Sequence, residues 1–184
     1  IRATTQFDDA GKPVKAVGVI LDIDAEKRQA QELTDKAERD PLTKLYNKDT
    51  ARDKIQRMLD RQDIGDRFAL LIIDLDNFKQ VNDLRGHMFG DAVLAEAAAR
   101  LRALFRSEDV VARFGGDEFL VFLQYTCDED FLQEKASKVV ETFRNVYSDE
   151  IQELYLTCSV GVSRCPDNGA DFQTLFQCCD QALY

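Results

Sequence analysis

Apolar residues fall in short runs that predict strands. Residues 68–73 are continuously apolar, which is typical of a strand buried on both faces. Apolar runs at 110–112 and 119–123 flank a short break that contains two glycines, and this pattern predicts a β-hairpin. A further strand is predicted over 154–162.

The segments between these runs have the period of amphipathic helices. The longest helical stripe runs from Val93 to Leu104, and the pattern ends at Phe105. Other helices are predicted over 50–60, 130–147 and 171–184. The order strand, helix, hairpin, helix, strand, helix predicts an α+β fold in which helices surround a central mixed, mainly antiparallel sheet.

The first 39 residues follow a different pattern. Two β-like runs within residues 1–24 are separated by a turn-like stretch at 8–13, which predicts a hairpin. Residues 25–39 are charged and favour a helix, with Leu33 inside an apolar seam of period seven that predicts a short coiled-coil linker. A solvated single helix explains this stretch nearly as well. The seam residues spaced seven apart are Ile23, Ala30 and Ala37.

Composition narrows the classes of function. The chain has 184 residues, of which 45% are hydrophobic, and this suffices for one domain with a sizeable core. A formal charge of −10 argues against a nucleic-acid partner. No apolar run approaches the roughly 20 residues that span a bilayer, and five cysteines without a C-x-x-C pattern suit the reducing cytoplasm. Because the chain begins at Ile1 without methionine or a visible signal peptide, we expect a fragment of a longer protein.

Two carboxylates follow the strand at 68–73. Asp74 and Asp76 are alternate residues of an extended segment, so we expect them to share a face, while Leu75 turns away and offers its backbone carbonyl as a ligand. Oxygen ligands of this kind suit Mg²⁺, and the chain has no dense His/Cys set that would suit zinc. Turn-forming acids explain the two aspartates equally well on this pattern alone.

The break in the predicted hairpin has two glycines followed by two acids. Gly115 and Gly116 lack side chains and can reach positive φ, so substrate phosphates could approach the backbone closely. Asp117 and Glu118 would stand at the mouth of this turn. Taken alone, Gly-Gly-Asp-Glu is more often an ordinary solvated hairpin turn.

Three motifs, in this order and spacing, resemble the GGDEF domain of diguanylate cyclases. They are Asp74-Leu75-Asp76-Asn77-Phe78-Lys79-Gln80-Val81-Asn82-Asp83, Gly86-His87-Met88-Phe89-Gly90-Asp91 and Gly115-Gly116-Asp117-Glu118-Phe119. The resemblance covers residues 40–184, and the hairpin at 1–24 is similar to the last strands of a PAS sensor domain, which leaves 25–39 as a linker helix. The family normally continues into a helix whose Lys and Arg clamp the substrate phosphates, so we expect the domain to be truncated at its C-terminus.

The resemblance implies that two GTP molecules condense into cyclic di-GMP with release of two pyrophosphates, at a homodimer interface where each domain supplies half a site. It implies Mg²⁺ or Mn²⁺ as cofactor, with Asp74, Asp117 and the Leu75 carbonyl as ligands. Glu118 would assist the second metal or deprotonate the attacking 3′-hydroxyl, and Lys79 would bind the terminal phosphates. Asp117, Glu118 and Lys79 are thus the implied catalytic residues. The implied substrate-binding residues are Asn77, Phe78, Lys79, Asn82, Asp91, Gly115 and Gly116.

Asn82 and Asp91 match the positions that read guanine in this family. The amide would contact the O6/N3 edge, and the carboxylate would accept from N1 and the exocyclic amine. Adenine cannot donate in that way, so Asp91 favours GTP over ATP. Without the resemblance, Asp91 is better explained as the cap of a helix that begins near Ala92, and Asn82 as a turn residue.

Arg106 and Asp109 resemble the family's allosteric product-binding site, in which arginine contacts guanine O6 and N7. Feedback inhibition by cyclic di-GMP is therefore implied, although a surface ion pair at i,i+3 is the simpler alternative. Two rivals to an active cyclase also stay open. One is a catalytically silent module that binds GTP or cyclic di-GMP, and the other is a dimerising output domain that acts through contact alone.

Overall fold

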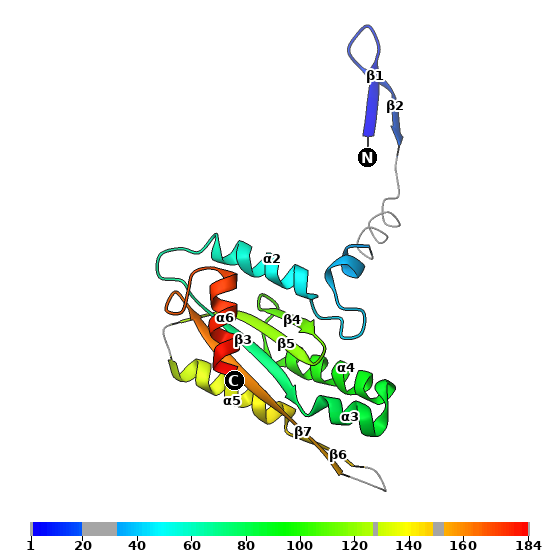
Figure 1. The fold of residues 1–184 in the computed structure, drawn as a ribbon. Helices are drawn as coiled ribbons and strands as arrows, with labels where there is room; N and C mark the ends of the chain where they lie inside the picture. The colour runs from blue at the N-terminus through cyan, green and yellow to red at the C-terminus, as the bar shows by residue number, and fades with distance from the viewer. Residues whose placement is uncertain (1, 20–32, 127–128, 149–152, 184) are drawn as a thin grey trace. The chain divides into compact units, whose positions relative to one another are not determined.

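The structure is a computed structural model, and it describes residues 2–19, 33–126, 129–148 and 153–183. The chain divides into two compact units, Ile1–Ala37 and Glu38–Tyr184, and Figure 1 traces them from blue to red in chain order. None of the helices in the described ranges is long and apolar enough to cross a bilayer.

The smaller unit contains the predicted hairpin. Strand β1 (Arg2–Phe7) pairs with β2 (Pro13–Val19) in antiparallel register. The carboxylate of Asp8 closes the turn by accepting hydrogen bonds from two backbone N–H groups, at 3.0 and 2.8 Å. Residues 33–38 are helical, and Leu33 is exposed. Ile23 and Ala30 of the predicted seam lie outside the described residues, so the coiled coil stays a prediction.

The larger unit is built on a five-stranded sheet with the order β4-β5-β3-β7-β6. Neighbouring strands in this order are antiparallel, and a parallel bridge joins Tyr46 to Ala112. The predicted α+β fold with a mainly antiparallel sheet is confirmed. The strands are β3 (Arg67–Asp76), β4 (Val110–Gly115), β5 (Glu118–Tyr125), β6 (Asn145–Ser148) and β7 (Glu153–Cys165).

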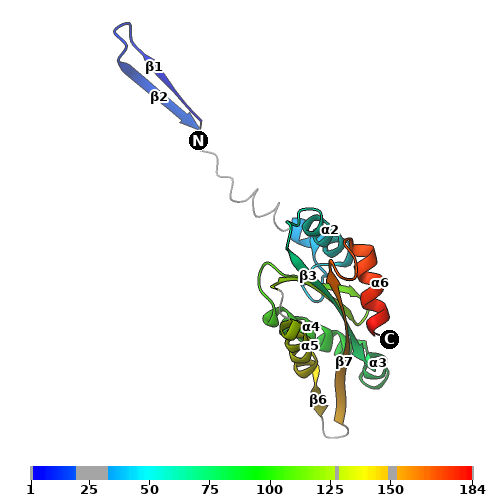
Figure 2. The ribbon, with the colours of Figure 1, turned by 90° about the vertical axis from the view of Figure 1, so that its left-hand side faces the viewer.

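Helices cover both faces of this sheet, with α4 and α5 on one side and α6 on the other in Figure 2. The fold gives the reason for the continuous apolar run of β3, because alternate residues of this strand are buried in two different cores. Leu71 and Ile73 join the core that includes α4 and α5, whereas Leu70 and Ile72 join the core that includes α2 and α6. The helices are α2 (Lys48–Leu59), α3 (Phe78–Arg85), α4 (His87–Leu104), α5 (Glu129–Phe143) and α6 (Phe172–Leu183).

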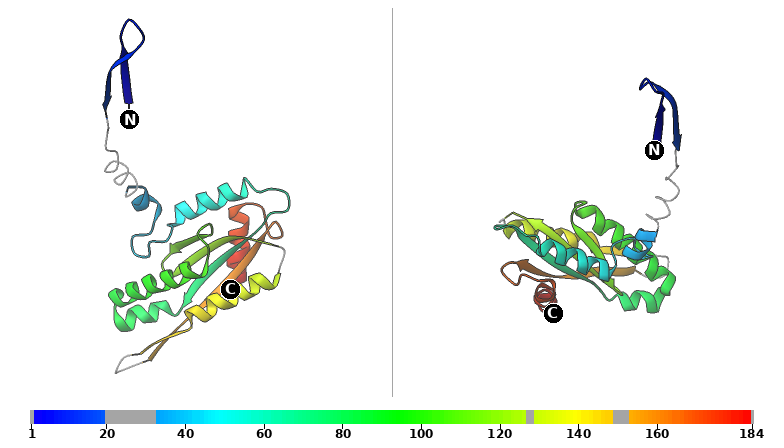
Figure 3. Two further views of the ribbon diagram at one scale, coloured as in Figure 1. Left: turned by 180° about the vertical axis from the view of Figure 1, so that it is seen from behind. Right: turned by 90° about the horizontal axis from the view of Figure 1, so that it is seen from above.

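One predicted boundary is wrong, and one helix was not predicted. The helix predicted over 130–147 ends at Phe143, and residues 145–148 instead form β6, which pairs with the end of β7. The sequence also did not reveal α3, which lies beside α4 in Figures 1 and 3. Gly86 separates these two helices: its N–H bonds to the carbonyl of Asn82 at 2.8 Å, and its φ of 81° favours glycine.

Candidate functional site

The ends of β3 and β5 bring carboxylates together. Asp74 lies opposite Glu118 in the β3–β5 register, and the Leu75 N–H donates to the Asp117 carbonyl at 3.4 Å. Burial is the largest cause that raises the pKa of Asp74, and the charges of Asp117 and Asp76 raise it further. Burial is likewise the largest cause that raises the pKa of Glu118, and the charges of Asp74 and Asp117 raise it further. A cation placed among these carboxylates would relieve their repulsion.

The donor set fits a hard divalent cation. Asp74, Asp117 and Glu118 provide oxygen donors, which Mg²⁺ and Mn²⁺ prefer. In the part of the chain that the structure describes, no three His, Cys, Asp or Glu residues are arranged to hold a metal ion by themselves. Mg²⁺ is commonly held by one or two carboxylates and completes its shell with water and substrate phosphates. The site therefore suits a metal whose coordination shell is completed by water or by ligand oxygens.

Asp76 has a different environment from Asp74. Its two carboxylate oxygens accept hydrogen bonds from the hydroxyls of Thr157, at 2.6 Å, and Ser159, at 2.8 Å. Thr157 and Ser159 lie on β7, so these bonds tie the end of β3 to the neighbouring strand. The prediction that Asp74 and Asp76 form one acidic pair thus misses the hydroxyl partners that occupy Asp76.

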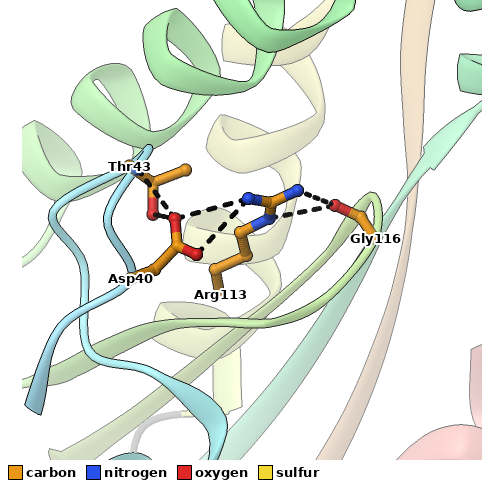
Figure 4. Close-up of polar contacts among 4 residues, drawn as sticks. All are labelled: Asp40, Thr43, Arg113 and Gly116. Carbon is orange, nitrogen blue, oxygen red and sulfur yellow. Dashed lines mark hydrogen bonds and ion pairs between the residues drawn. The ribbon is translucent and has the colours of Figure 1, made fainter. Parts of the chain in front are cut away.

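A tight turn carries Gly116 and Asp117 between β4 and β5, and Gly116 has a φ of 45°. Arg113 fixes this turn, because its Nε and Nη2 donate to the Gly116 carbonyl at 3.0 and 2.8 Å (Figure 4). The Nη1 of Arg113 lies 3.4 Å from both carboxylate oxygens of Asp40. We call this chain of contacts from Asp40 through Arg113 to Gly116 the turn clamp.

Asp40 is itself held in place within the turn clamp. Its Oδ1 accepts from the backbone N–H of Thr43 at 2.8 Å and from the Thr43 hydroxyl at 2.7 Å. Partial burial alone would raise the pKa of Asp40, but the hydrogen bonds from Thr43 and the charge of Arg113 outweigh it and lower the pKa. Asp40 is therefore a carboxylate in its charged form at neutral pH.

A cavity of about 360 Å³ lies between the α3–α4 pair and the β4–β5 turn. It joins the predicted base-reading residues, Asn82 and Asp91, to residues of the predicted phosphate and metal region. Asn82 lies within α3 and Asp91 within α4, so the alternative that Asp91 caps a helix near Ala92 is wrong. The lining residues are Phe78, Lys79, Asn82, His87, Asp91, Leu94, Arg113, Gly116 and Asp117.

Not every predicted residue lines this cavity, and some lining residues were not predicted. Asn77 is exposed with a φ of 59° at the start of α3, and Gly115 is exposed at the end of β4. The substrate contacts predicted for these two residues stay predictions. His87 and Arg113 were missed as lining residues. A basic residue two positions before the glycine pair was the available signal for Arg113.

The predicted product-binding pair lies in a separate place. Arg106 and Asp109 help to line a cavity of about 260 Å³ together with residues of β5 and α5. Asp109 is buried, and its carboxylate accepts from the backbone N–H of Arg106 at 2.8 Å. This contact holds the loop together, and because Asp109 is buried, the alternative of a surface ion pair does not describe its environment. Binding of product there stays a prediction.

Comparison with known families assigns the fold to a class. The family described as "Diguanylate cyclase, GGDEF domain" matches residues 37–184. The chain therefore belongs to the GGDEF-domain family, as the three motifs predict.

Individual relatives differ in their named activities. The chain is 34% identical over 163 residues to the cyclic di-GMP phosphodiesterase PdeR of Escherichia coli, covering 89% of this chain and 24% of PdeR. It is 37% identical over 159 residues to the bifunctional diguanylate cyclase/cyclic di-GMP phosphodiesterase MucR of Pseudomonas aeruginosa, covering 85% and 23%. A crystal structure of a sensory box/GGDEF family protein from Caulobacter crescentus superposes with a TM-score of 0.73 at 37% identity, covering 80% of this chain and 96% of that one. The chain thus spans about a quarter of the length of these two curated relatives.

Proposed function

We propose that this chain is a diguanylate cyclase domain that joins two GTP molecules into cyclic di-GMP. The observation that carries the proposal is the 360 Å³ cavity, which places Asn82 and Asp91 in the same space as Lys79, Gly116 and Asp117. At one end of the cavity, an amide and a carboxylate would read the guanine base of GTP. At the other end, the phosphates of GTP would reach a cation and a glycine turn.

Each condensation forms a bond between a ribose 3′-oxygen and an α-phosphorus, and it breaks the bond from that phosphorus to pyrophosphate. Two such steps on a pair of facing domains close the ring. The proton of the attacking hydroxyl passes to Glu118 or to solvent. Bound Mg²⁺ or Mn²⁺ would supply charge stabilisation for the phosphate oxygens. Asp74, Asp117, Glu118 and the Leu75 carbonyl would hold it.

Regulation and context form part of the same proposal. Arg106 and Asp109 would bind cyclic di-GMP and slow the enzyme. Residues 1–24 would be the end of a PAS-like sensor and 25–39 a linker helix that promotes the homodimer, in a protein of the cytoplasm. The description of the Caulobacter structure as a sensory box/GGDEF protein and the free cysteines, among them Cys158 and Cys179, support this context.

The decisive experiment incubates the chain at high concentration with GTP and Mg²⁺ and separates the products by chromatography. The Glu118→Gln variant, which keeps the size of the side chain but removes its charge, is the matched control. Cyclic di-GMP formed by the parent and not by the variant would support the cyclase. A parent that binds GTP without forming product would be a binding module, an alternative favoured by the phosphodiesterase name of PdeR. A parent that neither binds nor converts GTP would refute the proposal.

A further inference from the structure

Gly90 lies next to both predicted base-reading residues, Asn82 and Asp91. It is buried in the first turn of α4, directly before Asp91 in the chain, and it faces α3. A Cβ atom built at Gly90 would lie 2.0 Å from Oδ1 and 3.0 Å from Cγ of Asn82. The same atom would lie 3.2 Å from Cζ of Phe78. The end of the Asn82 side chain therefore occupies the space that any other residue at position 90 would fill.

Backbone conformation does not explain this glycine. Gly90 is helical, a conformation that every L-residue adopts, and glycine weakens the interior of a helix relative to alanine. Gly86 provides the contrast, since it has a φ of 81° and a Cβ atom added there would meet no neighbouring atom of the described chain within 4 Å. Position 86 calls for glycine because of its backbone, whereas position 90 calls for glycine because of the Asn82 amide.

We propose that Gly90 is a specificity-determining residue that positions the Asn82 amide beside the guanine base. This inference rests on the proposed function, in which Asn82 and Asp91 read guanine. Gly90 fixes the spacing of these two groups, because it touches one of them and precedes the other in the chain.

Asn82 has few ways to avoid an added methyl group at position 90. Its own carbonyl accepts from the Gly86 N–H at 2.8 Å, which anchors the end of α3. The neighbouring α3 residues Phe78 and Val81 are buried in the core and keep the helix in place. The side chain of Asn82 has only two torsions, so its amide would rotate out of the position that faces the cavity.

The test measures binding of the α,β-methylene analogue of GTP, whose α–β linkage resists cleavage, in the presence of Mg²⁺. Four proteins are compared by isothermal titration calorimetry: the parent chain, Gly90→Ala, Asn82→Ala and the double variant. We expect each single variant to bind roughly tenfold to a hundredfold more weakly, as for the loss of one polar base contact. The preference for this analogue over its adenine counterpart should fall in both single variants.

The double variant separates positioning from a general disturbance. Without the Asn82 amide, the methyl group at position 90 has no base contact to displace, so the double variant should bind within about twofold of Asn82→Ala. Equal losses from Gly90→Ala in the two backgrounds would overturn the inference, because they would indicate that the methyl group acts independently of the amide. Thermal unfolding of the four proteins by circular dichroism shows whether each is folded.

Failure of the inference can be told apart from failure of the proposed function. If the parent does not bind the GTP analogue, or if Asn82→Ala binds as well as the parent, the proposed guanine site is wrong and the inference fails with it. If Asn82→Ala binds weakly while Gly90→Ala binds like the parent, only the role of Gly90 is wrong.

Discussion

The turn clamp offers the sharpest test of how this fold holds the turn between β4 and β5. Replacing Arg113 by alanine removes both hydrogen bonds to the Gly116 carbonyl and the ion pair with Asp40. Thr43 would still donate two hydrogen bonds to Asp40, so that carboxylate keeps polar partners. The loss should therefore fall on the turn and on the free energy of unfolding.

The size of the loss follows from the contacts. A hydrogen bond from a charged donor contributes about 1.5–3 kcal/mol, and we count the contact with Gly116 once because both N–H groups share one acceptor. The ion pair at 3.4 Å joins side chains that are each 18% exposed, and we assign it about 0.5–1 kcal/mol because water screens part of it. We expect Arg113→Ala to lower the free energy of unfolding by about 2–4 kcal/mol.

Urea denaturation followed by circular dichroism measures this loss without nucleotide, so contacts between Arg113 and a ligand do not enter. Arg113→Lys is the matched control, since it keeps the charge but loses the planar fork, and it should recover only part of the stability. A double-mutant cycle with Asp40→Asn should give a coupling of about 0.5–1 kcal/mol at pH 7. Equal urea midpoints and slopes for the parent and Arg113→Ala would refute the clamp.

The pH dependence of the coupling has a definite sign. The pKa of Asp40 is lowered in the folded protein, so the folded state favours the charged carboxylate. The stabilisation that the charged Asp40 carboxylate contributes is fully present above its ordinary pKa of 3.8, and it is lost as the pH falls through the lowered pKa. The coupling between Arg113 and Asp40 should therefore be constant from about pH 5 to 7, within the range where Asp40 is charged.

Two further predictions concern the acidic cluster and the second cavity. Burial and the charges of Asp117 and Asp76 raise the pKa of Asp74 in the folded protein. The folded state therefore becomes less stable, relative to the unfolded state, as the pH rises from 3.8 through this raised pKa. At pH 7, Asp74→Asn should thus be more stable than the metal-free parent by on the order of 0.5 kcal/mol after solvent screening. The same variant should form no cyclic di-GMP. A lower stability of the variant in calorimetric scans with EDTA would contradict this reasoning. Arg106→Ala should keep the parent's initial rate and lose its inhibition by added cyclic di-GMP, as measured by pyrophosphate release; inhibition equal to the parent's would place the product site elsewhere.

Long, strongly patterned elements could be predicted from the sequence. The apolar run of β3 and the hairpin around Gly115 and Gly116 have patterns that only a buried strand and a tight turn explain well. The motif residues also converged as expected, since Asn82, Asp91 and Asp117 line one cavity. The apolar and turn patterns were enough for the strand and the hairpin, whereas the cavity residues were predicted from the resemblance to the GGDEF family.

Short elements and distant contacts could not be predicted. Helix α3 has eight residues, too few for helical periodicity to stand out, and it depends on packing of Phe78 and Val81 for stability. Strand β6 has four residues, and it forms only because β7 extends far enough to pair with it. The ion pair of the turn clamp joins residues 73 positions apart, a separation over which no local pattern carries information.

The cavity draws its residues from two different parts of the fold. Lys79, Asn82 and Asp91 belong to the α3–α4 pair, whereas Arg113, Gly116 and Asp117 belong to the end of β4 and the turn that follows it. In the proposed function, the helical pair would read the base and supply Lys79, and the turn would bind the phosphates from the other side of the cavity. Protein engineers could exploit this arrangement by changing Asn82 and Asp91 while keeping Lys79 and the turn, to test whether the same domain accepts another nucleobase.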